Sequence, residues 1–266
     1  MEEWFRLGKE IRRLVNPDTF PVAVKLLTDD SQVPPSARRP LRDLKVKMAP
    51  CQGTAMARRY GWTVAFGRED VGCAIAAHTF GWEEQINEAA AVDFFLRMNY
   101  VSDGEAAREA IAGFRHLNMG NNVTVVYSPL ERTKIEPDVV AVFANPAQMM
   151  RLIHGATHHT GVPLDSRFSG RAGSCTEGII GAYLDKTPKL VVPGNGDRVW
   201  ATCQDHEMMM AIPAERLGEV VEGMDKTHQK GVRYPIPTYM RYRPEVAFTV
   251  PLSDIFKPQD VTGEKS

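Results

Sequence analysis

The chain has 266 residues, of which 43% are hydrophobic and 24% are charged, and its formal net charge is -1 at pH 7. This composition is typical of a folded globular protein and excludes a largely disordered chain. A charge so close to neutral argues against a nucleic-acid-binding protein, which needs a basic face. No run approaches the ~20 apolar residues of a membrane span, and the charged N-terminus is unlike a signal peptide. We therefore expect a cytoplasmic protein that binds neither nucleic acid nor membrane.

Apolar spacing, β-rich runs and breakers predict alternating helices and strands in the first part of the chain. The N-terminal helix should stop at Asn16 and Pro17, and a long loop should follow the first strand. The predicted elements are a helix over 4–14, a strand over 21–27, a loop over 28–44, a helix from Cys51 to Gly61, a strand over 62–66, a turn over 67–70 and a helix from Cys73 to Phe80.

The middle and last parts of the chain continue this alternation. Asn145 and Pro146 are typical of a helix start, and Asn195-Gly196 indicates a β-hairpin turn. The predicted elements are a broken helical stretch over 83–117, strands over 122–127 and 138–144, a helix from Asn145 to Gly161, a helix from Cys175 to Leu184, a hairpin around 194–197, a strand over 207–212 and a helix over 213–227.

No sharp change of composition divides the chain, so we expect one mixed α/β domain over residues 1–256 and a loose polar tail over 257–266. Weak internal similarity indicates two pseudo-duplicated halves near 45–118 and 138–230. In each, a cysteine opens a helix, a β element follows, and a second cysteine comes after it. A pseudo-twofold arrangement of such halves would bring cysteines that are distant in the sequence to one interface.

The chain has four cysteines, namely Cys51, Cys73, Cys175 and Cys203. Stable disulfides are rare in a reducing compartment, which leaves metal ligation, catalysis or simple burial as roles. No two of them show the two-residue spacing of common zinc and ferredoxin motifs, and free cysteines often pack as small hydrophobic residues. Cys51 and Cys175 nevertheless stand at predicted helix starts, where the N–H groups lower a thiol pKa and favour the thiolate.

Residues around these cysteines could bind an anion. Gly173, just before Cys175, would allow backbone amides to approach a ligand, and Arg171 and Arg198 could bind a carboxylate or phosphate through their guanidinium groups. Two weaker constellations remain open. His154 and His158 could face one metal or form a polar helix edge, and Asp205-His206-Glu207 could supply acid–base groups or form a solvated turn. Gly194-x-Gly196 lies in the predicted hairpin, which argues against a dinucleotide-binding turn.

Four segments resemble a known family: CQGTAMARRYG, PDVVAVFANPAQMMRLI, SGRAGSC and VVPGNGDR with the following HEMMMAIP. In these the chain is similar to the prokaryotic family called domain of unknown function 169, first noted as an archaeal conserved region. The resemblance implies a shared fold and cysteines at the positions of Cys51, Cys73 and Cys175, and it implies no reaction. Many members carry another cysteine after the proline that matches Pro193, where this chain has Gly194. The family's frequency in anaerobes and archaea fits an oxygen-sensitive cluster.

The leading hypothesis is an iron–sulfur protein with a [4Fe–4S] cluster or another thiophilic metal. Cys51, Cys73 and Cys175 would be ligands, and Cys203 is the uncertain fourth. Redox or Lewis-acid chemistry on a small anionic molecule would follow. One alternative is a metal-free module that binds a small molecule and uses its cysteines for packing. Another is a thiol enzyme with Cys175 as nucleophile. The sequence leaves the reaction open, and a homo-oligomer is compatible with it.

Overall fold

In the computed structural model, residues 1–83, 86–120 and 123–236 are described, and their strands form a six-stranded antiparallel sheet in the order β2-β3-β1-β4-β6-β5. This mixture of helices and one sheet confirms the predicted α/β class. The predicted tail over 257–266 and Asn122, the first residue of one predicted strand, lie outside the described residues. The strands are β1 Val22–Leu27, β2 Val64–Phe66, β3 Thr124–Pro129, β4 Val139–Ala144, β5 Lys189–Val191 and β6 Met208–Pro213.

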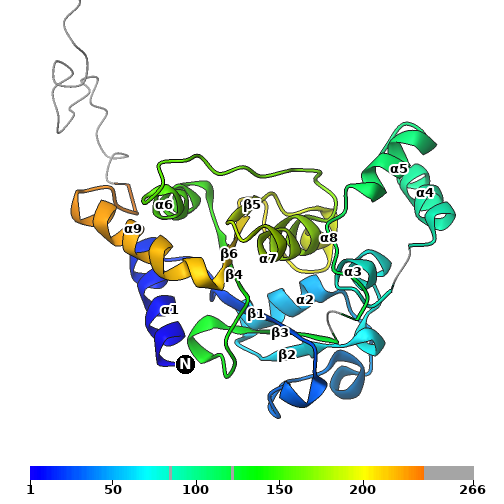
Figure 1. Ribbon diagram of the computed structural model, residues 1–266, viewed down its shortest axis with the longest axis horizontal. Coiled ribbons are helices and arrows are strands. Elements are labelled where there is room, and N and C mark those ends of the chain that lie inside the picture. Colours follow the sequence, from blue (N-terminus) through cyan, green and yellow to red (C-terminus); the bar gives the residue numbers. More distant parts are fainter. Residues whose placement is uncertain (84–85, 121–122, 237–266) are drawn as a thin grey trace, which may run out of the picture. The chain divides into compact units, whose positions relative to one another are not determined.

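Helices cover both faces of the sheet, which explains why its long strands read as continuous apolar runs (Figure 1). One face packs against α1, α6 and α9, and the other packs against the helices that carry the cysteines. The α-helices are α1 Glu2–Val15, α2 Pro50–Ala55, α3 Ala74–Thr79, α4 Glu88–Arg97, α5 Gly104–Ala112, α6 Pro146–Thr157, α7 Gly181–Asp185, α8 Asn195–Val199 and α9 Leu217–Gln229. None of those described is long and apolar enough to cross a membrane.

Short π- and 3-10 helices complete the described elements. Two of the π-helices adjoin α-helices: α2, which carries Cys51, runs into η3, and η6, which carries Cys175, runs into α7. The π-helices are η2 Pro40–Leu44, η3 Met56–Tyr60 and η6 Gly173–Ile180, and the 3-10 helices are η1 Asp30–Gln32, η4 Arg68–Asp70, η5 Leu130–Arg132 and η7 Ala214–Arg216. The predicted loop over 28–44 therefore contains η1 and η2.

The order of the strands is symmetric about the antiparallel pairing of β1 with β4. Each half contributes an inner strand (β1 or β4), a middle strand (β3 or β6) and a short edge strand (β2 or β5). Each middle strand runs directly into a 3-10 helix, η5 in the first half and η7 in the second. An internal duplication would produce this arrangement, although the duplication itself stays a prediction.

Local signals at two helix ends act as the sequence predicted. Asn145 accepts a hydrogen bond from the N–H of Gln148, and the Gln148 side chain accepts one from the N–H of Asn145, each at 2.9 Å. At the end of α1, Asn16 adopts a left-handed conformation with φ 50° and donates its N–H to Arg12. Such caps satisfy backbone groups that a helix end leaves without partners.

The predicted β-hairpin around 194–197 is wrong, because β5 is followed by the helix α8 and not by a second strand. Asp197 explains the difference. Its carboxylate accepts the N–H of Gly194 at 2.9 Å and so caps the first turn of α8, while it also binds Ser174 on η6. A contact distant in the sequence thus overrides the turn preference of Asn-Gly. The argument that a hairpin excludes a strand-to-helix turn here fails with it.

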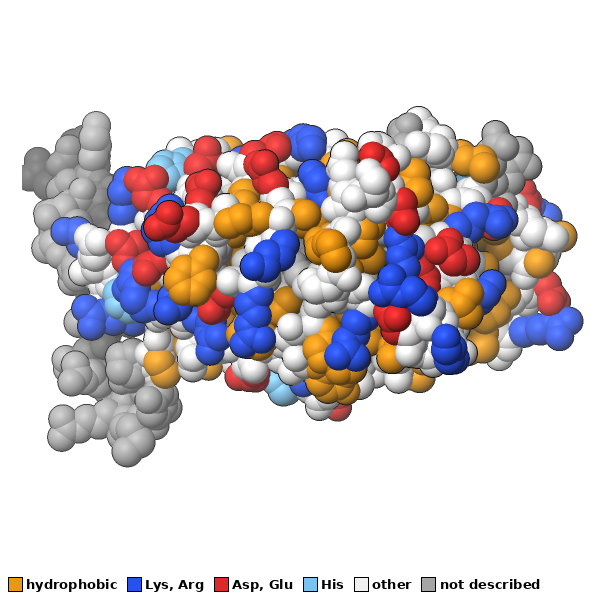
Figure 2. Space-filling model, turned by 90° about the horizontal axis from the view of Figure 1, so that it is seen from below, with side chains coloured by type: hydrophobic (Ala, Val, Ile, Leu, Met, Phe, Trp, Pro, Cys, Tyr) orange, Lys and Arg blue, Asp and Glu red, His pale blue; other side chains and the backbone are white. Residues whose placement is uncertain are grey.

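α4 and α5 form a helical pair that projects from the rest of the described fold (Figure 1). Its own small core contains Phe95, Ala107 and Phe114, and Phe94 and Met98 remain exposed. On the face of the molecule in Figure 2, basic side chains are scattered among acidic and hydrophobic ones.

Candidate cysteine site

Three cysteines from distant segments come together on the face of the sheet opposite α1 and α9. Cys51 lies in the first turn of α2, Cys73 is the N-cap of α3, and Cys175 lies in the first turn of η6. Cys73 and Cys175 pack against a small cluster that contains Cys51 and three alanines, Ala49, Ala55 and Ala201. The backbone N–H of Cys51 lies near enough to the Cys175 thiol to favour its thiolate.

Backbone N–H groups at the helix starts lie near the thiols of Cys73 and Cys175. Cys73 makes no capping hydrogen bond to α3, but the nearby N–H groups of Ala76 and Ile75 favour its thiolate and act to lower its pKa. The turn that carries Cys51 is fixed by Gln52, whose side chain accepts the N–H of Ala49 at 2.9 Å. Such N–H groups stabilise a thiolate or any other negative charge on sulfur.

Burial nevertheless raises the pKa of all three thiols. For Cys51, desolvation is the largest cause. The nearby groups Cys175, Asp197 and Cys73 add to it, because each disfavours a second negative charge. Burial also raises the pKa of Cys73 and of Cys175. The prediction of lowered thiol pKa values is therefore wrong for the ligand-free chain, because desolvation outweighs the helix starts. A bound cation would reverse this balance, since a coordinating thiol loses its proton.

Asp197, on α8, connects this helix to the start of η6 through hydrogen bonds. Its buried carboxylate accepts the N–H of Ser174 at 3.2 Å and the N–H of Gly194 at 2.9 Å, and the Ser174 hydroxyl donates to it as well. Burial raises the pKa of Asp197 in spite of these donors. The sequence argument did not single out this residue. The sequence pattern that could have identified it is a glycine, Gly194, after the predicted strand, followed three residues later by an aspartate.

Tyr127 on β3 lies behind the cysteines with an unsatisfied hydroxyl. Its side chain is fully buried, and within the described residues its Oη has no hydrogen-bond partner. Burial raises the pKa of Tyr127, with Cys175 and Cys51 as the next causes, so the hydroxyl lies near both thiols. A buried hydroxyl without a partner is costly and calls for an acceptor. No local sequence pattern would have assigned this strand residue to the site.

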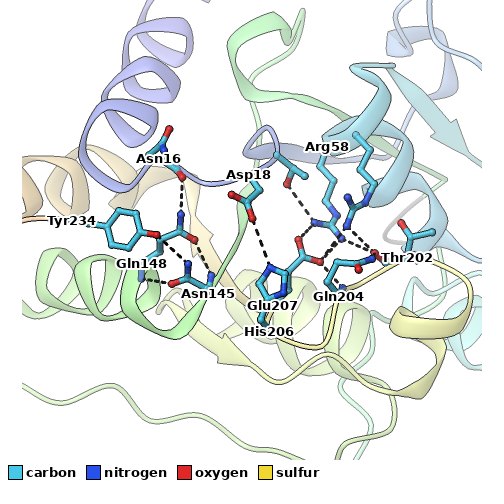
Figure 3. Close-up of polar contacts among 12 residues, drawn as sticks. Asn16, Asp18, Arg58, Asn145, Gln148, Thr202, Gln204, His206, Glu207 and Tyr234 are labelled. Atoms are coloured by element: carbon cyan, nitrogen blue, oxygen red, sulfur yellow. Dashed lines mark hydrogen bonds and ion pairs between the residues drawn. The ribbon is translucent and has the colours of Figure 1, made fainter. Parts of the chain in front are cut away.

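Cys203 lies outside the small cluster that contains Cys51, beside the buried ion pair of Arg58 with Glu207. Figure 3 shows that ion pair. Arg58 on η3 donates to both carboxylate oxygens of Glu207, at 2.5 and 2.9 Å, and the two side chains are 1% and 4% exposed. Arg58 also stacks on the ring of Phe143, 4.1 Å from its centroid. Burial raises the pKa of Cys203 to about 12, and Arg58 offsets only part of that effect. Glu207 is therefore no part of a solvated turn.

The three predicted anion-binding residues have different surroundings. Arg171 lines a cavity beside α5. Gly173 is buried where η6 packs on β5, and a Cβ there would lie 2.8 Å from the Val192 carbonyl oxygen. Arg198 lies on α8 and donates to the carbonyl of Gln204 at 2.8 Å. At Gly194, where relatives were expected to carry cysteine, a Cβ would collide with the Arg171 carbonyl. A side chain at position 194 would require the backbone to shift.

Within the residues that the structure describes, no group of three or more His, Cys, Asp or Glu side chains is arranged to hold a metal ion. His154 and His158 therefore do not belong to a three-ligand site there. The Nδ1 of His154 is buried without a hydrogen-bond partner among the described residues, and burial lowers the pKa of this imidazole.

Comparison with known proteins assigns the chain to a family. Residues 10–223 match domain of unknown function 169, described as "Uncharacterised ArCR", and the chain belongs to this family, as its sequence motifs predicted. It is also 25% identical over 223 residues to "Uncharacterized protein MJ0308" of Methanocaldococcus jannaschii, which covers 84% of this chain and 94% of the relative. No solved structure matches the chain significantly. These descriptions specify no reaction, so the chemistry rests on the site.

Proposed function

We propose that the protein binds an iron–sulfur cluster of the [4Fe–4S] type through Cys51, Cys73 and Cys175. The observation that carries this proposal is the meeting of three thiols from three distant segments, each at the start of a helix. Iron–sulfur clusters are held by cysteine thiolates. A cluster also spans more space than one ion, so its ligands need not be arranged around a single metal position.

The surroundings of the three cysteines support a bulky, electron-rich group. The neighbours Ala49, Ala55 and Ala201 are small, and the buried hydroxyl of Tyr127 lacks an acceptor among the described residues. Such a hydroxyl could donate to a cluster or cysteine sulfur, as could the N–H groups at the helix starts. Hydrogen bonds to sulfur are one of the means by which a protein tunes the potential of a cluster.

Three protein ligands would leave one iron without a cysteine. Cys203 is not proposed as the fourth ligand, because it lies beside Arg58 and Glu207 and outside the cluster of small residues. Cys73 and Cys175 are partly exposed, so a small molecule could reach the site from their side. A bound cluster would supply electron transfer or Lewis-acid chemistry there.

Anaerobic purification followed by visible spectroscopy and analysis of iron, sulfide and zinc tests this proposal. We expect a brown protein with about four iron and four sulfide per chain. Cys51→Ala, Cys73→Ala and Cys175→Ala should each lose the colour, whereas Cys203→Ala, the matched control, should keep it. A protein that stays colourless and iron-free after anaerobic reconstitution, with four titratable thiols, would rule the cluster out. Stoichiometric zinc in place of iron would also contradict it.

A further inference from the structure

A cavity of about 590 Å³ lies between α5, residues 165–171 and the η6–α7 helix. Its volume is within the range of small-molecule sites, roughly 300–1,000 Å³. One part of its lining is apolar and includes Val101, Ala110 and Phe114, and another part carries charged side chains. A cavity of this kind suits a ligand with an apolar body and a charged end.

Some of the charges in this cavity are already neutralised by the protein. Asp185 pairs with Lys189 at 2.8 Å and also with Arg115, so this acid has two basic partners. These three residues form an internal ion-pair group at the end of α7. These residues line one side of the cavity, and because they are paired with each other, a ligand need not supply a charge to pair with them.

Arg171 and Glu177 differ, because both are partly buried and neither forms an ion pair within the described residues. The remaining charged residues of the lining are exposed, namely Glu109, Asp165 and Arg167. The Arg171 Nη1 donates to the carbonyl of Tyr100 at 3.3 Å, and the guanidinium lies over the ring of Phe95, 5.7 Å from its centroid. The Arg171 Nε is buried and has no hydrogen-bond partner among the described residues, and the same is true of the Glu177 Oε2. Each charged group thus has one buried atom whose hydrogen-bonding capacity is unused, which is costly and which a complementary ligand could satisfy.

Ser169 is hydrogen-bonded to both residues, to the backbone of Arg171 and to the side chain of Glu177. The Ser169 Oγ accepts the N–H of Arg171 at 3.3 Å, and its hydroxyl and its N–H both bind the Glu177 Oε1, the N–H at 2.9 Å. Residues 158–172 contain no helix or strand, and long irregular segments of this kind often form binding loops. A ligand ammonium could replace Ser169 as the donor to Glu177 through a small shift of this segment.

We propose that this cavity binds a small zwitterion with an apolar side chain. Its carboxylate would bind Arg171, its ammonium group would bind Glu177, and its apolar part would lie against Ala110 and Phe114. Guanidinium–carboxylate and ammonium–carboxylate contacts are charge-assisted and therefore strong. The proposal is independent of the cluster, although Glu177 lies on the same π-helix as Cys175.

Calorimetric titration of the full chain with three matched probes tests this. L-Phenylalanine carries both charges, 3-phenylpropanoate only the negative one and 2-phenylethylamine only the positive one. We expect phenylalanine to bind at least about tenfold more tightly than either partial probe, since each lost charged contact costs about that factor. Arg171→Gln should abolish its advantage over the amine, and Glu177→Gln should abolish its advantage over the acid.

Two further variants separate the cavity from general effects. Ala110→Trp should fill the cavity and remove binding, whereas Arg97→Gln, a change at an exposed arginine of α4, should leave it unchanged. Each titration is run on protein with and without bound iron, and we expect the same affinity in both. The proposal is overturned if phenylalanine does not bind at roughly millimolar concentration, or if the three probes bind alike.

Discussion

After the edge strand of each half of the sheet, an aspartate carboxylate accepts the N–H of the glycine three residues before it, but the two aspartates have different further partners. After β2, the Asp70 carboxylate accepts the N–H of Gly67 at 3.0 Å, and after β5, Asp197 accepts the N–H of Gly194 at 2.9 Å. Both aspartates are buried. Asp70 also has a cation nearby, because Arg39 lies 3.5 Å away. Asp197 instead binds Ser174, the residue before Cys175.

The same type of buried turn is therefore purely structural in the first half and part of the cysteine site in the second. The charge of Asp70 is compensated by the largely buried guanidinium of Arg39. The charge of Asp197 lies among thiols and raises their pKa values, and Arg198 offsets it only weakly. The halves are also joined asymmetrically. Arg58 crosses from η3 to Glu207 and Phe143 in the second half.

The largest effect is expected where this crossing ion pair is broken. Arg58→Ala leaves the buried carboxylate of Glu207 without its main partner, which should lower the free energy of unfolding by about 3–5 kcal/mol. Urea unfolding followed by circular dichroism measures this. The exposed pair Arg97–Asp93 is the control, and Arg97→Ala should cost under about 1 kcal/mol. Equal effects of the two changes would show that the Arg58 pair does not join the halves.

Paired changes at the two aspartates should separate structure from site. Asp70→Asn and Asp197→Asn should each cost about 1–3 kcal/mol, since each weakens buried hydrogen bonds. Only Asp197→Asn should lower the thiol pKa values and speed alkylation of the ligand-free protein by iodoacetamide, because its negative charge raises them. Mass spectrometry of Cys73 and Cys175 measures the rates. Equal acceleration by Asp70→Asn would contradict this distinction.

The stability difference between the native protein and Asp197→Asn should depend on pH. The folded pKa of Asp197 is raised by burial, so its contribution to stability is fully present below the unfolded pKa and is lost as pH rises through the folded pKa. The stability advantage of the native protein over Asp197→Asn should therefore grow on acidification from neutral pH. Unfolding curves of both proteins at several pH values measure it. An advantage that shrinks at lower pH would show that the carboxylate is held in its charged form.

Glycines in the two cysteine-bearing helices offer a finer comparison. A Cβ at Gly53 would lie 2.6 Å from the Tyr127 ring and 2.7 Å from the Phe66 ring, whereas at Gly178 it would first meet the flexible end of Met209. Gly53→Ala should therefore cost about 1–3 kcal/mol through overpacking, and Gly178→Ala should cost less. Thermal unfolding of the two variants measures the difference, and a larger loss at Gly178 would mean that Met209 cannot move aside.

The smallest effect, and one of opposite sign, is expected at Tyr127. Tyr127→Phe removes a buried hydroxyl that has no partner among the described residues, so the ligand-free protein should be unchanged or more stable by up to about 1 kcal/mol. If the proposed cluster is bound, the same change should shift its reduction potential, which a redox titration measures. A clear loss of stability in the ligand-free protein would show that the hydroxyl already has a partner.

Much of the secondary structure was predictable because its signals are local. The apolar spacing of α1, the capping residues of α6 and the continuous apolar runs of β1 and β4 each lie within one element. The hairpin expected at 194–197 failed because Asp197 reaches back to Ser174, a contact that no short window contains. The thiol pKa values were misjudged for a similar reason, since burial depends on all the elements packed around the cysteines.

The sequence by itself determined the α/β class, most helix and strand positions, the family and the set of cysteines from which a site could be built. Only the tertiary structure decided that Cys51, Cys73 and Cys175 lie together, while Cys203 lies beside Arg58 and Glu207. It also revealed the unsatisfied hydroxyl of Tyr127 and the buried, unpartnered side-chain atoms of Arg171 and Glu177. Propensity and capping act over a few residues, but burial and electrostatic partnership depend on which distant segments the folded sheet places in contact.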